Sequence, residues 1–190
     1  MDEYHYQWLK GKPNWWFRYK RKVIGGAIDG SCLNIGCGHH LIKGAKNTEE
    51  DATQLKYKNR SFDTVVLADV LEHIKDDKTA LHKAIGIAKK RVVITVPVHP
   101  WLFSEYDELL GHKRRYRKRD FDGLKRMYDL DTRFLYGALF PLFVIRKLCG
   151  LKRTPRLWKP IDSLFYAAAH LRLPWGTTLF IILHKQKRKT

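Results

Sequence analysis

The chain has 190 residues, 44% of them hydrophobic, and a formal net charge of +18 at pH 7. This length and composition favour one folded domain and exclude wholesale disorder, and three cysteines are too few for a disulfide framework. No apolar run reaches the roughly 18–20 residues of a membrane-spanning helix, and the first residues lack the apolar core of a signal peptide. We therefore expect a cytoplasmic protein whose charge either maintains solubility or attracts anionic partners.

The first 28 residues are rich in aromatic and basic side chains. Pro13 suits the first turn of a helix, and apolar residues recur at helical spacing from Trp15 to Ile28. Lys20 and its basic neighbours are predicted to lie mostly on the opposite, solvated face. We expect this helix to pack on the domain, and the alternative is a basic, aromatic lid over a pocket or on a membrane surface.

Short apolar runs alternate with helical segments along the rest of the chain. The predicted strands are Cys32–Ile35, Lys46–Glu50, Phe62–Leu67, Arg91–Pro97, Thr132–Tyr136 and Thr178–His184. Helices are predicted to begin at Asp76 or Asp77, at Asp120 and at Leu164, and Gly137–Cys149 is expected to be a core helix. This alternation favours crossover connections and an α/β fold with a mostly parallel sheet.

Three turns that follow strands are expected to face one cleft. They are Gly36–His40, Ala68–His73 and Pro97–Trp101. Ligands of such sheets bind beyond the carboxyl ends of the strands, and Gly36 and Gly38 allow backbone N–H groups to approach a ligand closely. A nicotinamide-binding domain is not expected, because the third glycine of its G-x-G-x-x-G motif would fall on Leu41.

Taken together, these segments resemble the class I S-adenosylmethionine-dependent methyltransferases. Leu33–Gly38 resembles the family's first motif, Asp51-Ala52 its adenine-contacting turn, and Val70–His73 a segment of the branch that includes ubiquinone-type methyltransferases. Trp101, Ser104, Asp107, Gly111-His112 and Arg114-Arg115-Tyr116 resemble the W-S…D…G-H-x-R-R-Y block of one subgroup. The resemblance covers roughly residues 14–185 of the single domain expected over residues 1–190. It implies a Rossmann-like, mostly parallel sheet with flanking helices and an antiparallel last strand.

The resemblance also implies the cofactor, S-adenosylmethionine, and the residues that bind it. These are Asn34, Gly36, Cys37, Gly38, Glu50, Asp51, Ala52 and Asp69. Asn34 stands where the family usually has an acid, and His40 replaces a third glycine. The stretch from Gly38 to Asp51 is short for a crossover helix and a second strand, so we expect the sheet to be reduced there. A non-catalytic cofactor-binding or scaffold protein is the alternative that these departures suggest.

Methyl transfer from this cofactor is an in-line displacement that depends mainly on positioning, with a base only where the acceptor must lose a proton. His99 and His112 are the candidate bases, because the imidazole pKa is near neutral. The candidate substrate-binding residues are His73, Trp101, Arg114, Arg115 and Tyr116, and the two arginines are suited to clamp a phosphate or carboxylate. No His, Cys and Asp pattern has ligand spacing, so no metal site is expected.

The acceptor is expected to be an anionic small molecule, glycan or lipid-linked compound. An apolar and basic insertion at residues 137–173, together with the N-terminal segment, suits peripheral contact with a membrane. RNA is the second hypothesis, because the charge of +18 favours polyanions. Against RNA, the sequence contains no recognisable RNA-binding module. It predicts no oligomeric state.

Overall fold

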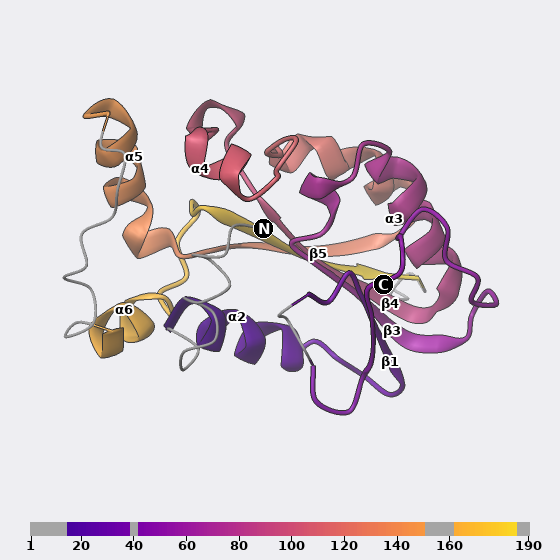
Figure 1. Cartoon of the computed structure of the whole chain (residues 1–190). Coiled ribbons are helices and arrows are strands. Elements are labelled where there is room, and N and C mark those ends of the chain that lie inside the picture. Colours follow the sequence, from indigo (N-terminus) through magenta and orange to yellow (C-terminus); the bar gives the residue numbers. More distant parts are fainter. Residues whose placement is uncertain (1–14, 39–41, 151–161, 186–190) are drawn as a thin grey trace.

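The computed structural model describes residues 15–38, 42–150 and 162–185, and its centre is one sheet (Figure 1). Within these residues the sheet has six strands in the order β2-β1-β3-β4-β6-β5. The strands are β1 (Cys32–Ile35), β2 (Lys46–Thr48), β3 (Phe62–Ala68), β4 (Ala88–Pro97), β5 (Asp129–Leu135) and β6 (Thr178–His184). The first four are parallel, and β6 runs antiparallel to both β4 and β5. The predicted α/β fold with an antiparallel last strand is thus confirmed.

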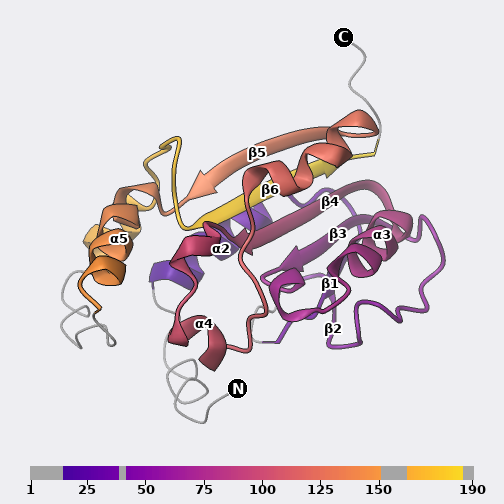
Figure 2. The ribbon, with the colours of Figure 1, turned by 90° about the horizontal axis from the view of Figure 1, so that it is seen from above.

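Helices cover both faces of the sheet (Figures 1 and 2). One layer holds α2 (Trp15–Gly25) and α6 (Asp162–Ala168), and the other holds α3 (Asp77–Ile87) and the 3-10 segment η3 (Lys118–Arg126). The remaining elements lie near the strand ends: η1 (Leu71–His73), η2 (Pro100–Leu102), α4 (Glu105–Leu109), η4 (Gly137–Leu139) and α5 (Phe140–Leu148). None of the helices in the described residues is long and apolar enough to cross a bilayer.

The second half of the central strand β3, Val65–Ala68, is buried on both faces, which explains its apolar sequence. Val65 and Leu67 pack in the core on the α3 side, whereas Val66 and Ala68 pack in the core on the α2 side. This alternation follows from the two-residue period of a strand. Asp76 begins α3 as predicted, because its side chain accepts a hydrogen bond of 3.1 Å from the backbone N–H of Thr79.

The sheet is reduced around β2, as the short sequence between the first two strands predicted. No helix forms among the described residues between β1 and β2, and β2 has only three residues. Asn47 holds this short connection in place. Its amide group exchanges hydrogen bonds with the backbone of Ile42, and its Oδ1 accepts a 2.8 Å bond from Asn34 Nδ2. Side-chain hydrogen bonds therefore replace the usual crossover helix at this edge.

Helix α5 does not have the core position that its apolar sequence predicted. Leu142, Ile145 and Leu148 are 44%, 53% and 77% exposed. The helix follows β5 and lies beyond the end of the sheet (Figure 2). Only the side of the helix opposite these exposed residues packs against the rest of the protein. The expectation of a core helix was wrong because an apolar composition does not by itself say which elements are available to bury a segment.

Candidate active site

The predicted turns lie at one edge of the sheet, beyond the carboxyl ends of β1, β3 and β4. Each of these turns contains residues with positive φ: Gly36 (59°) and Gly38 (43°), Asp69 (55°) and His99 (64°). For a residue other than glycine this conformation costs about 1–2 kcal/mol, and such strain concentrates at functional sites. The edge predicted from the sequence is therefore the candidate active site.

The two glycines of the first turn have different surroundings. A Cβ added to Gly36 would lie 3.0 Å from both methyl groups of Val70, so this glycine is required by packing. A Cβ added to Gly38 would meet no heavy atom within 4 Å in the described structure. The backbone of Gly38 therefore borders open space at the strand end, as a close approach to a ligand requires.

A buried ion pair lies at the end of β3. The Thr95 hydroxyl donates a 2.8 Å hydrogen bond to Asp69 Oδ1, and Lys20 Nζ pairs with Asp69 Oδ2. The Lys20 side chain is only 3% exposed, and its ammonium lies 5.8 Å from the centre of the Trp16 ring. The prediction that Lys20 faces solvent was wrong. Lys20 is four residues from both Trp16 and Ile24, and this spacing could have assigned it to the buried stripe.

Asp107 organises the segment that follows β4. It is completely buried and closes a capping box with Ser104 at the start of α4. Its Oδ1 accepts hydrogen bonds of 2.9 Å from His112 Nδ1 and 2.8 Å from Arg115 Nε, and its Oδ2 accepts a 3.0 Å bond from Arg115 Nη2. Burial alone would raise the pKa of Asp107, but the hydrogen bonds from His112 and Arg115 hold it below its usual range.

The two arginines of the predicted anion clamp pair with carboxylates of the chain. Arg115 directs its fork at Asp107 and donates from Nη1 to the carbonyl of Val98 at 3.3 Å. Arg114 pairs with Asp77 at 3.1 Å. Both guanidinium groups pair with carboxylates of the protein itself, so a substrate anion would compete with Asp77 and Asp107 for them, and the bidentate clamp stays a prediction.

The side chain of Tyr116 also makes its contacts inside the protein and does not face the open side of the strand ends. Its hydroxyl donates a 2.7 Å hydrogen bond to Asp77, and its backbone pairs with that of Pro97 and His99. The isolated bridge between Val98 and Tyr116 completes this contact. The G-H-x-R-R-Y block therefore fastens its loop to the end of β4.

The predicted histidines gather near the site in two places. His73 and His112 are neighbours, with ring centres 4.8 Å apart, and burial followed by the proximity of His112 lowers the pKa of His73. His99 is separate. Its Nε2 donates a 2.9 Å hydrogen bond to the carbonyl of Gly176, and burial lowers its pKa, which keeps the ring neutral and able to accept a proton. Trp101 is 52% exposed beside His99.

Comparison with known proteins agrees with this arrangement. A family model described as "Methyltransferase domain" matches residues 17–95. The chain is similar to a SAM-dependent methyltransferase of Archaeoglobus fulgidus, with 16% identity and a TM-score of 0.61 over 97% of this chain and 100% of the other. It is also similar to a Thermotoga maritima SAM-dependent methyltransferase, described as a possible histamine N-methyltransferase, with 15% identity and a TM-score of 0.60 over 90% and 89% of the two chains.

A third similar structure is phosphoethanolamine N-methyltransferase 2 of Haemonchus contortus, solved in complex with S-adenosyl-L-methionine. It shares 15% identity and a TM-score of 0.51 over 84% of this chain and 50% of the other. At these identities the solved structures show the fold. The comparison with curated proteins gives no match. Residues 17–95 thus match a methyltransferase domain, and the fold is the one seen in S-adenosylmethionine-dependent methyltransferases.

The cofactor of S-adenosylmethionine-dependent methyltransferases has a charged amino-acid end, and its contacts with the strand-end residues of this chain stay a prediction. That end carries an ammonium and a carboxylate, and the Asp69–Lys20 pair presents the complementary carboxylate and ammonium at one point of the edge. The open space at Gly38 lies at the same edge. Lys20 is a candidate that sequence reasoning missed, and its role toward the cofactor, like that of Asp69, stays a prediction.

The remaining predicted cofactor residues of the methyltransferase surround the β1 and β2 ends. Asn34 is fully buried, and Cys37 is buried with a thiol pKa raised first by burial and then by Glu49. Glu50 is exposed, and its Oε1 accepts hydrogen bonds from Thr48 at 3.1 Å and Tyr57 at 3.0 Å. Their roles toward the cofactor stay predictions.

Asp51 and Ala52 form the turn after β2. Asp51 is exposed, and its Oδ1 accepts hydrogen bonds of 2.8 Å from both the backbone N–H and the hydroxyl of Thr53. These bonds lower the pKa of Asp51. The local turn role is thus present, while Ala52 is buried in the core next to it. Adenine binding by Asp51 stays a prediction.

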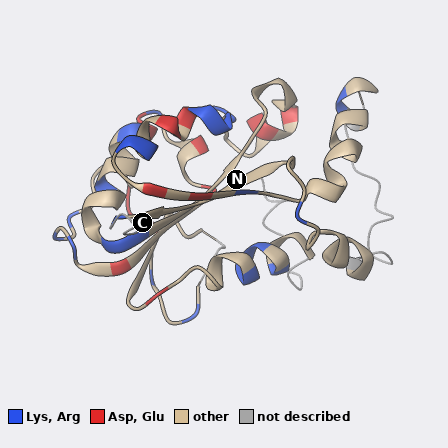
Figure 3. Ribbon diagram, turned by 180° about the vertical axis from the view of Figure 1, so that it is seen from behind, with Lys and Arg blue, Asp and Glu red and all other residues tan. Residues whose placement is uncertain are grey.

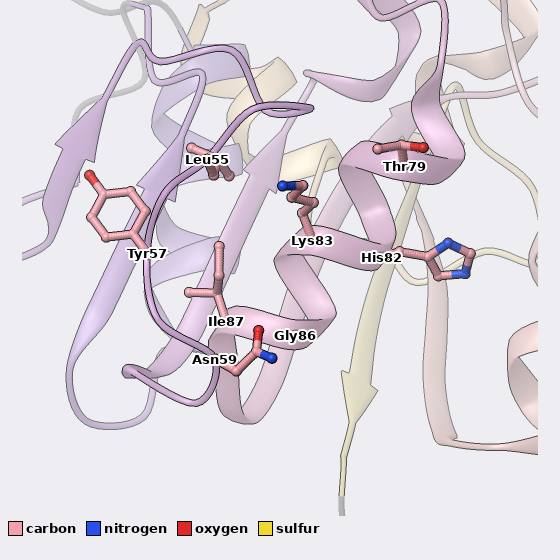
Figure 4. Close-up of a pocket in the computed structure, with 8 residues that line it drawn as sticks. All are labelled: Leu55, Tyr57, Asn59, Thr79, His82, Lys83, Gly86 and Ile87. Carbon is pink, nitrogen blue, oxygen red and sulfur yellow. The ribbon is translucent and has the colours of Figure 1, made fainter.

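A shallow groove of about 390 Å³ lies elsewhere, between α3 and the loop before β3 (Figure 4). Its lining residues are Leu55, Tyr57, Asn59, Thr79, His82, Lys83, Gly86 and Ile87. Each belongs to that loop or to α3, and none to the turns after β1, β3 and β4. We therefore do not assign the cofactor to this groove.

Proposed function

We propose that this methyltransferase transfers a methyl group to a small-molecule or lipid-linked acceptor with an apolar portion, presented at a lipid surface. The observation that carries the proposal is an apolar rim at the carboxyl edge of the sheet. Apolar side chains that are exposed to solvent are energetically unfavourable when they gather in one place, and such gatherings mark interaction sites.

The rim comprises the exposed large apolar residues of three segments, 101–109, 142–148 and 164–175. Its members are Trp101, Tyr106, Leu109, Leu142, Ile145, Leu148, Leu164, Leu171 and Trp175. The first two segments follow β4 and β5, and the third precedes β6, whose first residue pairs with the last residue of β4. All three segments therefore belong to the edge that carries Asp69 and His99.

The charge of the protein supports a membrane surface better than RNA. Lys and Arg lie on helices of both layers, on either side of the sheet (Figure 3), whereas nucleic-acid interfaces are typically polar and strongly basic. A rim of Trp, Tyr and Leu with basic surroundings suits the boundary between lipid headgroups and acyl chains. The internal use of Arg114 and Arg115 weakens one argument for an anionic acceptor, so the acceptor's charge stays open in the proposal.

In the proposed reaction, the residues of the chain act by binding and orienting the cofactor and the acceptor. When bound, S-adenosylmethionine supplies an electrophilic methyl group on a sulfonium sulfur. Asp69 and Lys20 hold its amino-acid end, and Gly38 lets the backbone approach. His99 faces the same edge as a neutral base that can take a proton from the acceptor when the acceptor is an alcohol or acid. Trp101, beside His99, is placed to contact the acceptor's apolar portion.

The cofactor part is tested by Gly38→Ala. The added Cβ meets no heavy atom of the described residues within 4 Å, so beyond about 1–2 kcal/mol of backbone strain the fold is expected to tolerate it. We expect the affinity for S-adenosylmethionine, measured by isothermal titration calorimetry, to fall by about tenfold or more, since the methyl group would occupy the space of the ligand. Gly44→Ala is the matched control, because Gly44 also has positive φ and open surroundings. Equal affinities in the two variants would contradict the assignment.

The acceptor part is tested by labelling. Purified protein and S-adenosylmethionine labelled at the methyl group are incubated with lipid extract, with polar small molecules and with RNA from the same cells. We expect label in the lipid extract or in amphiphilic small molecules. Label in RNA alone would overturn the proposal in favour of RNA methylation, and absence of cofactor binding would favour a scaffold.

The double substitution Ile145→Glu and Leu148→Glu tests the rim directly. Both side chains are exposed on α5, so the fold is expected to tolerate the change, while two carboxylates oppose insertion into a lipid interface. We expect retention on anionic liposomes to fall at least about tenfold, with cofactor affinity unchanged. Met127→Glu, an exposed apolar position away from the rim, is the control. Undiminished liposome binding would exclude α5 as the contact.

A further inference from the structure

Glu72 is a buried carboxyl group that the structure leaves without a partner. It lies in η1, directly after β3, with 1% of its surface exposed. Neither of its carboxylate oxygens has a hydrogen-bond partner in the described part of the chain. An unpaired buried polar group is costly, so each such group calls for an explanation.

Two histidines face the same point as Glu72. One potential ligand atom from each of Glu72, His73 and His112 lies within 4.8 Å of the other two. His112 Nδ1 donates to Asp107 at 2.9 Å, and His73 Nδ1 donates to the carbonyl of Gly111 at 3.3 Å. Both partners are acceptors, so the ring protons are fixed on Nδ1 and each Nε2 keeps its lone pair. Metal-binding histidines are typically held by this kind of outer hydrogen bond.

A cluster in which Glu72 is hydrogen-bonded to the two histidines is the simpler alternative, but these hydrogen bonds are missing. The side chain of Glu72 makes no hydrogen bond to either histidine, although the three groups are close. Ligand atoms around an ion with bonds of about 2.0–2.2 Å lie roughly 3–4 Å apart. The three atoms lie within 4.8 Å of one another, so binding of one ion requires them to move closer together. Three potential ligand atoms that lie close together without hydrogen bonds from Glu72 are compatible with a bound cation.

We propose that Glu72, His73 and His112 bind one divalent transition-metal ion of the Zn²⁺ or Co²⁺ type. Two imidazoles and one carboxylate suit such ions better than Mg²⁺, which prefers oxygen ligands. Three protein ligands also leave a coordination position open, as in catalytic rather than structural sites. The sequence predicted no metal site, because His73 and His112 are far apart in the chain and no ligand spacing is visible.

The open position suggests a role that rests on the proposed function. The site lies beside Asp69 at the end of β3, so an ion there would bind an oxygen of the acceptor and lower its pKa. This places acceptor binding, rather than cofactor binding, under the control of the metal.

Direct titration tests the site without any cofactor or acceptor. Untagged, full-length protein is freed of metal by chelator dialysis and titrated with Co²⁺, whose visible absorption reports coordination by nitrogen and oxygen. We expect one Co²⁺ per chain, displaced by Zn²⁺ and not by an equal concentration of Mg²⁺. Absence of binding below millimolar Co²⁺, or binding that Mg²⁺ displaces equally well, would overturn the proposal.

Substitutions locate the ion. Glu72→Gln preserves size and is expected to weaken Co²⁺ binding by more than about 100-fold, since even outer-sphere changes cost about 10–100-fold. His73→Asn, at an exposed position, is a second ligand variant in case Glu72→Gln does not fold. Glu108→Gln and His82→Asn, both exposed and outside the cluster, are the controls. Unchanged affinity in the ligand variants would contradict the assignment.

The metal site and the proposed function fail in distinguishable ways. A titration that shows no Co²⁺ binding would remove the metal site and leave the liposome result and the identity of the labelled acceptor standing, whereas failure of the liposome and labelling experiments leaves the titration unaffected. The link between the two is tested by chelation of the active enzyme. We expect methyl transfer to fall at least about tenfold while cofactor affinity is preserved, and to return with Zn²⁺ or Co²⁺. Transfer that is insensitive to chelation would overturn the role in acceptor binding.

Discussion

Asp107→Asn is expected to destabilise the protein by about 3–5 kcal/mol, because it removes the charge that neutralises the guanidinium of Arg115 in a buried setting. For a chain of this size, the change corresponds to a fall in Tm of roughly 6–20 °C. The substitution also removes the charged acceptor of the His112 ring. Thermal and urea unfolding measure the loss. A Tm within a few degrees of the wild type would show that Asp107 is not the centre of this loop.

Asp122→Asn is the matched control for this prediction. Asp122 pairs with Lys125 on the surface of η3, with both side chains about half exposed, so we expect a change within about 0.5 kcal/mol. The double variant Asp107→Asn and Arg115→Met should regain part of the loss, because it leaves no unpaired charge.

The pKa of Asp107 is lowered in the folded state, so its contribution to the free energy of unfolding is present above the unfolded pKa and is lost as the pH falls through the folded pKa. The difference between wild type and Asp107→Asn should therefore shrink in acid.

Lys20→Met is expected to weaken the binding of S-adenosylmethionine by about 10–100-fold. A hydrogen bond to a charged group is worth about 1.5–3 kcal/mol, and Lys20 is the buried cation next to Asp69 at the proposed position of the cofactor's carboxylate. Methionine preserves most of the volume of the lysine side chain. Calorimetry with the cofactor alone gives the affinity, and circular dichroism checks that the variant is folded.

Lys22→Met, an exposed lysine on the same helix, is the control and should bind the cofactor as the wild type does. The double variant Lys20→Met and Asp69→Asn separates stability from binding: it restores charge balance and should recover stability relative to Lys20→Met, but not affinity. A higher affinity in Lys20→Met would mean that the ammonium competes with the cofactor's cation for Asp69. That result would overturn the proposed role of the pair.

The metal proposal connects these two regions. Asp107 holds His112, and Asp69 lies beside Glu72 at the end of β3. The loop of the G-H-x-R-R-Y block thereby orients one proposed metal ligand and fixes the path of the chain after β4. We propose on this basis that the block shapes the acceptor side of the site, while the turn after β1 and the Asp69–Lys20 pair shape the cofactor side.

The sequence by itself determined the elements that depend on local patterns. The strands Cys32–Ile35 and Thr178–His184 were predicted with their observed bounds, because short, mostly apolar runs next to turn residues are characteristic of buried strands. The Asp76 cap of α3 and the reduction around β2 were likewise visible, since both depend on residues close together in the chain. The order of turns after strands was sufficient to predict the edge where the site lies.

Only the tertiary structure decided which distant side chains meet there. Lys20 is 49 residues from Asp69, and its burial follows from how α2 packs against the sheet. Arg115 was predicted to bind substrate because the sequence does not reveal that Asp107 folds back to meet its fork. Glu72, His73 and His112 converge because η1 and the loop after α4 lie against each other, with the backbone N–H of Lys113 bonded to the carbonyl of Glu72. Local patterns specify elements, whereas pairings between elements depend on topology, and the chemistry of this site depends on those pairings.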